Sequence, residues 1–396
     1  MRESAEIQNA RQKIVSSLAE TRMEAGISQK ELARRIGTHT PNISRIESGQ
    51  QNISLDTLLK IASALNKEVS VELKEKPAPA VSRYSLRLYD EELLTFSMED
   101  AGLSGLKTTF LSKNEDRLQV FPLDLALTDE GILTWLQKRI IPKNRAFAEE
   151  ILKTLDLSIN NTKGIIDICK GLSLNDSYWV VPEGFEGKFG AYNLYENRFS
   201  SALSLVAYTG ISHSKPVGTT SPELTTQGML RKAWRHLDKK GIYLFKGGTE
   251  GAANAGNEPY SEYYASQIAQ QMGLHAVMYD LENWTGILAS TCPLFTSIDT
   301  SYIPIGRIVK TGGLQACLDY YAGISPVAVE ELKSMLVFDA VIYNEDRHFG
   351  NFGILRDSHS GKVIGPAPIF DNGLSLFNYA MQDDIDNLEA YALTRK

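Results

Sequence analysis

Two short polar segments near the C-terminus each lie next to apolar runs. EDRHFGN, at residues 345–351, separates MLVFDAVIYN from FGIL, and DNG, at residues 371–373, follows VIGPAPIF. Asp and Asn are poor formers of helices and strands, so these segments predict loops at the ends of buried elements. Carboxylate and amide oxygens in such loops suit a divalent metal ion whose other ligands are phosphate and water.

The spacing of these polar residues fits a site for phosphate transfer. Asp346 and Asn351 form the pattern D-x-x-x-x-N, and Asp371 opens a D-x-G triplet. The catalytic loop of protein kinases has the first spacing, in which the Asp accepts the proton of the substrate hydroxyl and the Asn holds Mg²⁺. The Asp of a later D-x-G triplet holds the metal as well.

A cation for the phosphates and an acid to hold that cation occur upstream. Lys246 ends the strand predicted for GIYLFKGG, and Glu262 lies in the first turn of the helix predicted for SEYYASQIAQQMGL. A strand lysine paired with a helix glutamate belongs to the kinase scheme. Each pattern alone is usually a turn, but the ordered set predicts binding of ATP and Mg²⁺.

Composition excludes several other classes of protein. The 396 residues, 43% of them apolar and 22% charged, suffice for a globular chain of roughly two or three domains. Cys169, Cys292 and Cys317 lack the paired spacing of a disulfide framework or a zinc site. No secretory leader and no apolar run of about 20 residues is present, so we expect a cytoplasmic protein without a membrane segment. The net charge of −7 argues against broad nucleic-acid binding but leaves room for a local site.

Residues 13–73 predict a helical unit. Ser28 and Glu31 form a capping box that starts a helix, and Gly37 ends this helix. Pro41 then lies in the first turn of the next short helix. Two short helices joined by a tight turn form the arrangement that places the second helix in the DNA major groove.

This segment, SQKELARRIGTHTPNISRIESGQQNISLDTLLKIASAL, resembles the Xre-type, lambda-repressor-like helix-turn-helix family over about sixty residues. Glu47 and Arg22 match a structural ion pair of that family. Operator DNA and a second copy of the chain are the partners that the resemblance implies, because such domains bind two half-sites as dimers. Use of the same fold to dock a protein is the alternative. The DNA-facing residues that the resemblance implies are Gln29, Thr38, His39, Thr40, Asn42, Ser44 and Arg45.

The polar segments near the C-terminus carry a second resemblance. NEDRHFGNFGIL and FDNG, preceded by the lysine strand and the glutamate helix, resemble HipA-like Ser/Thr kinases, the toxin kinases of bacterial toxin-antitoxin modules. The similarity runs from about residue 215 to 377 and more weakly upstream to 130. The implied roles are catalytic base (Asp346), Mg²⁺ ligands (Asn351, Asp371), phosphate contact (Lys246), its carboxylate partner (Glu262) and brace of the catalytic loop (His348).

The same resemblance implies a short phosphate-binding loop ahead of the lysine strand. TTQGMLRK matches the glycine and the lysine of that loop at Gly228 and Lys232. The family phosphorylates its own hydroxyl just before the glycine, which ejects the loop because the added negative charge cannot stay beside the ATP phosphates. We expect this hydroxyl at Thr225, with Thr226 and Ser221 as further candidates.

The expected architecture is a multidomain α+β chain, with an N-terminal all-α domain followed by a two-lobed, protein-kinase-like body. KEKPAPAVSRYS, which has two prolines and no apolar periodicity, predicts the linker. The expected parts are an Xre-type helix-turn-helix domain (1–75), a linker (76–85), a region like the HipA N-terminal subdomain (86–215) and a HipA-like catalytic region (216–396).

The expected function is transfer of the ATP γ-phosphate to a Ser or Thr of a protein, combined with repression of the chain's own promoter. Known targets in the family are aminoacyl-tRNA synthetases. Two alternatives stay open. A transcription regulator whose kinase-like part senses nucleotide fits the 25 residues that follow Asp371, because the family usually continues further. A kinase for a small molecule or a lipid is the other, although no basic membrane-facing segment supports a lipid substrate.

Overall fold

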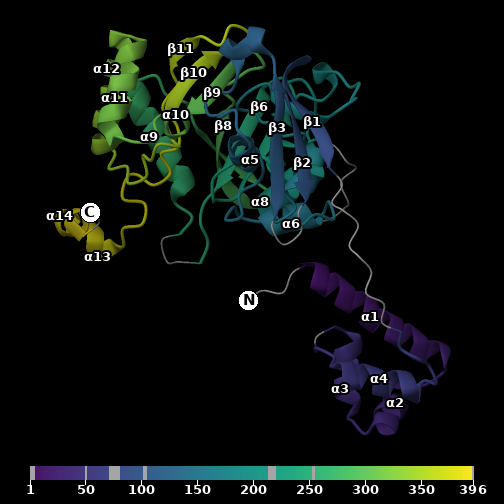
Figure 1. Ribbon diagram of the computed structural model, residues 1–396. Coiled ribbons are helices and arrows are strands. Elements are labelled where there is room, and N and C mark those ends of the chain that lie inside the picture. Colours follow the sequence, from purple (N-terminus) through teal and green to yellow (C-terminus); the bar gives the residue numbers. More distant parts are fainter. Residues whose placement is uncertain are drawn as a thin grey trace. The chain divides into compact units, whose positions relative to one another are not determined.

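A computed structural model gives the architecture of the chain. The chain forms two compact units, Met1–Ala78 and Pro79–Lys396 (Figure 1). No helix of the described residues combines the length and the apolar content that a bilayer crossing requires. The structure describes residues 5–49, 51–70, 81–100, 105–212, 220–251 and 255–394.

The first unit is helical, and its helix boundaries follow from the caps. The Ser28 side chain accepts from the Glu31 backbone N–H (3.1 Å), as predicted, but the Glu31 carboxylate binds Arg34 and Arg35 rather than reaching back. Gly37 ends the helix with a φ of 72°, a conformation that favours glycine. The helices are α1 (Ala5–Glu24), α2 (Gln29–Ile36), α3 (Thr40–Glu47) and α4 (Leu55–Ala64).

A small apolar core holds these helices together. Val15 of α1, Leu32 of α2, Ile43 of α3 and Ile61 of α4 are all almost fully buried and belong to one cluster. Apolar residues recur at helical spacing in these short segments, so that each helix turns one apolar face toward this core. Ser44 and Arg45 of α3 lie outside this core and are exposed.

The second unit begins with an antiparallel sheet and a group of helices. Neighbouring strands of the sheet follow the order β3-β2-β1-β4. The elements are β1 (Ser82–Leu88), β2 (Glu91–Asp100), β3 (Leu106–Lys113), η2 (Glu115–Val120), α5 (Asp129–Gln137), α6 (Ala148–Lys153), α7 (Thr162–Cys169), β4 (Tyr178–Pro182), η3 (Phe189–Ala191) and α8 (Ser201–Thr209).

The position of β1 corrects one prediction. The linker was expected over residues 76–85, but β1 begins at Ser82. Tyr84 and Leu86 are buried against the rest of the sheet, so the strand pattern begins directly after the prolines. Residues 76–80 of the predicted linker lie outside the described part of the chain.

Two further antiparallel sheets complete the second unit, with strand orders β5-β6-β8-β7 and β11-β10-β9. In Figure 1, α11 and α12 lie at one end of this unit and β1 to β3 at the other. The elements are η4 (Pro222–Leu224), β5 (Lys232–Leu237), β6 (Gly241–Gly247), α9 (Glu258–Gln271), β7 (Asp280–Trp284), β8 (Ile287–Pro293), β9 (Thr300–Pro304), α10 (Ile305–Ile308), α11 (Gly313–Ile324), α12 (Pro326–Val341), β10 (Gly353–Asp357), β11 (Val363–Pro366), α13 (Gln382–Ile385) and α14 (Leu388–Thr394).

Among the described residues of the second unit, the two largest hydrophobic cores correspond to its two lobes. The first core joins the first sheet, helices α5 to α8 and the strands β5, β6 and β8, to which it reaches through Ala233, Phe245 and Ala289. The second core joins α9, α11, α12 and β10, with Phe338 and Ile354 fully buried. Lys246 follows Phe245, a residue of the first core, directly in sequence. The D-x-x-x-x-N loop leads into β10, which belongs to the second core.

Candidate active site

Lys246 lies at the centre of a buried charge cluster. It is on β6, and its Nζ donates to Oε1 of Glu262 on α9 and to Oδ1 of Asp371. Only 8% of the Lys246 side chain and 1% of the Glu262 side chain are exposed. Helix α9 begins at Glu258, one turn earlier than predicted. Pro259 lies in its first turn, where the helix needs no backbone N–H from this residue and so accommodates a proline. The structure thus brings three residues of the predicted set into direct contact.

Electrostatics fixes the charge of these groups. Burial alone would lower the pKa of Lys246, but the carboxylates of Asp371 and Glu262 outweigh burial and raise it. Burial opposes ionisation of Asp371, yet Lys246 and Lys232 hold the pKa of that carboxyl below its usual range. Lys246 is therefore a cation and Asp371 an anion at neutral pH, as a site for phosphate and metal requires.

Arg347 joins the two polar loops. Its guanidinium lies in the D-x-x-x-x-N loop and binds both carboxylate oxygens of Asp339 on α12 (3.0 Å each). It also donates to the backbone carbonyls of Asn351 (2.9 Å) and Phe370 (2.6 Å) and to Oδ1 of Asn372 (2.5 Å). Because one side chain binds both loops, they lie side by side. Sequence reasoning missed this role, although an arginine between Asp346 and His348 was the signal.

Hydrogen bonds also shape the D-x-x-x-x-N loop itself. The backbone carbonyl of Asp346 accepts from the His348 N–H (2.8 Å) and from the Asn351 side-chain amide (3.1 Å). The Nδ1 of His348 accepts from the Gly350 N–H (3.0 Å), so this ring braces the loop as the sequence suggested. Burial raises the pKa of the Asp346 carboxyl, and the nearby His348 opposes this shift. A raised pKa makes this carboxylate a better proton acceptor.

The donor set fits a magnesium ion held mainly by phosphate. The amide nitrogen of Asn351 is engaged by the Asp346 carbonyl, which leaves its oxygen as the group available to a ligand. The Asp371 carboxylate is a second hard oxygen donor, and it is 36% exposed. Among the described residues no group of three or more His, Cys, Asp or Glu side chains could hold a metal without further ligands. Two oxygen donors beside a buried lysine suit Mg²⁺, which keeps several water or phosphate ligands.

The loop before β5 contains the predicted Gly228, and the predicted Lys232 is the first residue of β5. Lys232 pairs in register with Lys246 across β5 and β6, and its Nζ donates to the Gln227 carbonyl (3.0 Å). Gly228 has a φ of 92°, a conformation that favours glycine, and a Cβ there would displace the Lys232 ammonium. Burial and the charge of Lys246 lower the pKa of Lys232 to about 7. Two lysines therefore line the space in front of Asp371.

Thr225 lies directly before this loop but is buried. Its side chain is 4% exposed, and its hydroxyl donates to the Pro222 carbonyl (3.3 Å). Thr226 donates to the same carbonyl (2.7 Å), and Ser221, at 1% exposure, accepts from the Glu223 N–H (3.4 Å). Phosphorylation of Thr225 or Ser221 therefore requires a movement of the chain around these hydroxyls, whereas Thr226 is only half-buried.

In the first unit, the predicted DNA-facing residues form a hydrogen-bonded group around α3. The Asn42 amide donates to the Thr38 hydroxyl (3.1 Å) and accepts from Arg45 (2.9 Å). Gln29 donates to Glu47 (2.8 Å), which also binds Arg22. The Arg22–Glu47 ion pair is thus present, and it engages the Gln29 amide nitrogen. The other three residues of the predicted set lie at the start and on the face of α3: His39, Thr40 and Ser44.

Comparisons with known proteins agree with this division of the chain. Residues 18–71 match the helix-turn-helix family. An uncharacterized helix-turn-helix-type transcriptional regulator of Haemophilus influenzae is 43% identical over 63 residues, which cover 16% of this chain and 64% of the relative. The serine/threonine-protein kinase CtkA of Helicobacter pylori is 31% identical over 143 residues, which cover 33% of this chain and 43% of the relative. The chain spans less than two thirds of the length of either relative.

A solved structure supports the fold of most of the chain. The complex of HipA, HipB and operator DNA from the toxin-antitoxin system of Shewanella oneidensis MR-1 aligns over 73% of this chain and 75% of the matched chain. The TM-score is 0.50 and the identity 15%, so this likeness concerns the fold alone. The chain therefore joins an N-terminal helix-turn-helix domain to a second unit with the two-lobed fold of HipA-like kinases.

Proposed function

We propose that the second unit is a protein kinase that uses ATP and Mg²⁺ to phosphorylate a Ser or Thr of a protein. The observation that carries this proposal is the buried contact of Lys246 with both Glu262 and Asp371, beside a D-x-x-x-x-N loop that Arg347 joins to the D-N-G loop. The similarity to the kinase CtkA supports the same reading.

Each residue of the site has a distinct role in this proposal. Lys246 contacts the phosphates and Glu262 holds it in place, while Asn351 and Asp371 provide the oxygen ligands for the metal. ATP supplies the γ-phosphoryl group, and Mg²⁺ neutralises its charge. Asp346 would accept the proton of the substrate hydroxyl as that oxygen bonds to the γ-phosphorus and the bond from the γ-phosphorus to the β–γ bridging oxygen breaks, which releases ADP. Burial supports this role because it raises the pKa of the Asp346 carboxyl.

The loop before β5 is the proposed regulatory element. Gly228 and Lys232 receive the phosphates, and Thr225 is the proposed site of self-phosphorylation. Because Thr225 is buried against Pro222, a phosphate there would force the loop away from its present position. His348 braces the neighbouring catalytic loop.

The first unit is the proposed DNA-binding part. Helix α3 would enter the major groove, with Asn42 and its neighbours at base edges, and two copies of the chain would bind two half-sites of an operator. A cytoplasmic repressor of its own promoter follows from this arrangement. An aminoacyl-tRNA synthetase is the class of protein substrate that we propose to test first.

A labelling experiment tests the proposed function. The full-length chain is incubated with γ-labelled ATP and Mg²⁺, alongside the variant Asp346→Asn and the matched control Asp280→Asn, which alters an exposed carboxylate on β7. We expect Asp346→Asn to retain ATP affinity but to lose transfer by at least about 100-fold, and the control to behave as wild type. Equal transfer by both variants would contradict the role of Asp346. ATP binding by the wild type without any transfer would favour the nucleotide-sensing regulator.

A further inference from the structure

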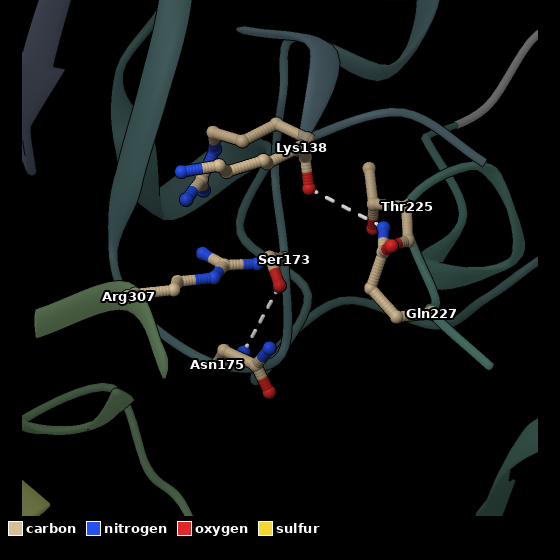
Figure 2. Close-up of a pocket in the computed structure, with 7 residues that line it drawn as sticks. Lys138, Ser173, Asn175, Thr225, Gln227 and Arg307 are labelled. Atoms are coloured by element: carbon tan, nitrogen blue, oxygen red, sulfur yellow. Dashed lines mark hydrogen bonds between the residues drawn. The ribbon is translucent and has the colours of Figure 1, made fainter. Parts of the chain in front are cut away.

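The segment between α5 and α6 contacts the loop before β5 at several points. The side-chain amide of Gln227 donates to the backbone carbonyls of Lys138 (3.3 Å) and Ile140 (3.1 Å). Figure 2 shows this amide directed toward Lys138 across a small recess. The Ala146 N–H donates to the Met229 carbonyl (2.7 Å). Residues 138–146 therefore hold the middle of the loop.

Arg145 of this segment binds both ends of the same loop. Its guanidinium donates to the carbonyl of Glu223 (2.6 Å) and to the Glu223 carboxylate (2.5 Å), which lie before the loop. It also donates to the carbonyl of Lys232 (2.9 Å), which lies after the loop. The remaining Glu223 oxygen accepts from the Trp234 N–H (2.7 Å) on β5. One side chain thus fixes the distance between the two ends.

Burial makes this arrangement rigid rather than adaptable. The Arg145 and Glu223 side chains are both 0% exposed, so neither group can exchange its partner for water. A buried ion pair adds little net stability compared with an apolar pair, but its hydrogen bonds strongly restrict geometry. Both terminal guanidinium nitrogens of Arg145 are engaged, whereas its buried Nε has no hydrogen-bond partner among the described residues. The pair lies outside the charge cluster of Lys246, and the proposed reaction does not use it.

The loop faces the site on its other side. The carbonyl of Gln227 accepts from the Lys232 ammonium, while the side chain of the same residue binds the Lys138 and Ile140 carbonyls. A shift of the loop away from the segment 138–146 would therefore displace both Gly228 and Lys232.

We propose that Arg145 is a positioning residue for the phosphate-binding loop: it holds residues 223 and 232 at the separation that keeps Gly228 and Lys232 in front of the ATP phosphates. The statement that Gly228 and Lys232 face the ATP phosphates rests on the proposed function. Arg145 itself touches no reacting atom. It acts through the loop.

The substitution Arg145→Lys tests the inference because it keeps the positive charge and removes the forked set of guanidinium N–H donors. A lysine ammonium is a single point donor and cannot bind the Glu223 carboxylate, the Glu223 carbonyl and the Lys232 carbonyl together. Arg356→Lys is the matched control. Arg356 is also buried and also binds backbone carbonyls through a fork, those of Gly361 (2.6 Å), Phe121 (2.7 Å) and Gln119 (2.5 Å), none of which belongs to the loop.

Two readouts separate positioning from a general loss of stability. The first is hydrogen exchange of the backbone amides of residues 226–231 without nucleotide. The second is the ATP dissociation constant beside kcat at saturating ATP, with thermal melting of each variant as reference. We expect Arg145→Lys to accelerate exchange in the loop and to weaken ATP binding by about tenfold or more, with a smaller effect on kcat. Arg356→Lys should lower the melting temperature without either change.

Several results would contradict the proposed role of Arg145. Unchanged loop exchange in folded Arg145→Lys, or equal effects of the two variants on exchange and affinity, would overturn the inference. If Arg145→Lys does not fold, Glu223→Gln takes its place, because it neutralises the carboxylate that Arg145 binds and should accelerate loop exchange in the same direction; unchanged exchange there also overturns the inference. A wild type that binds no ATP would refute the proposed function, whereas the exchange comparison would still decide whether Arg145 holds the loop.

Discussion

Lys232 provides a prediction whose sign and magnitude follow from its surroundings. Its side chain is 8% exposed, and its Nζ donates to the Gln227 carbonyl. Burial, followed by the positive charge of Lys246, lowers its pKa from 10.5 to about 7. The charged groups that act on Lys232 are Lys246, Asp371, Arg145 and Glu262.

The lowered pKa links the free energy of unfolding to pH. Above about pH 7, the unfolded chain keeps a proton on Lys232 that the folded chain has lost, until both have lost it near the ordinary lysine pKa of 10.5. The unfolded state then binds more protons, so the stability of the folded state rises with pH. The slope approaches ~1.4 kcal/mol per pH unit, which amounts to about 2 kcal/mol between pH 7 and pH 9.

Lys232→Met removes this titration and should remove the slope. Urea unfolding of the wild type and the variant is measured from pH 6.5 to pH 9.5, and the difference between their free energies of unfolding is plotted against pH. We expect the wild type to gain about 2 kcal/mol relative to the variant between pH 7 and pH 9. Lys240→Met, which removes an exposed lysine between β5 and β6, is the control. A wild-type-minus-variant difference that does not change with pH would refute the reasoning.

Three further predictions concern other parts of the chain. Arg347→Ala should lower the free energy of unfolding by about 3–5 kcal/mol, because Asp339 loses its buried partner; a loss below 1 kcal/mol in urea unfolding would contradict this. Asn42→Ala should weaken binding to a selected palindromic operator by about 1–3 kcal/mol and binding to random DNA far less, measured by fluorescence anisotropy; equal losses would exclude base readout. Thr225→Ala should remove most of the self-incorporated phosphate in mass spectrometry; phosphate that persists on another hydroxyl would contradict the assignment to Thr225.

Local signals in the sequence predicted the helices and strands well, but they did not predict which of these elements contact one another. Ser28 and Gly37 mark the ends of α2 because capping depends on neighbouring residues. The strand that ends near Lys246 and the helix of Glu262 were predicted from short patterns, and β6 and α9 have these residues. The start of β1 was placed too late because the prolines suggested a longer linker than the structure has.

Long-range contacts were beyond the reach of such patterns. Arg145 and Arg347 read as ordinary charged residues in the sequence, yet each is buried and binds segments far away in the chain. A single sequence gives the charge of a side chain but not its burial, and burial decides whether an arginine is a solvated surface group or an organising one. The same holds for Lys232, whose pKa depends on its position opposite Lys246.

The most direct test of the central claim is calorimetric titration of the full-length chain with ATP, with and without Mg²⁺, for the wild type and for Lys246→Met. The claim is that the buried cluster of Lys246, Glu262 and Asp371 receives the ATP phosphates. It predicts binding that strengthens with Mg²⁺ in the wild type and falls by at least about tenfold in the variant, while thermal melting shows that the variant is folded. ATP affinity that is equal in the two proteins, or indifferent to Mg²⁺, would contradict the claim.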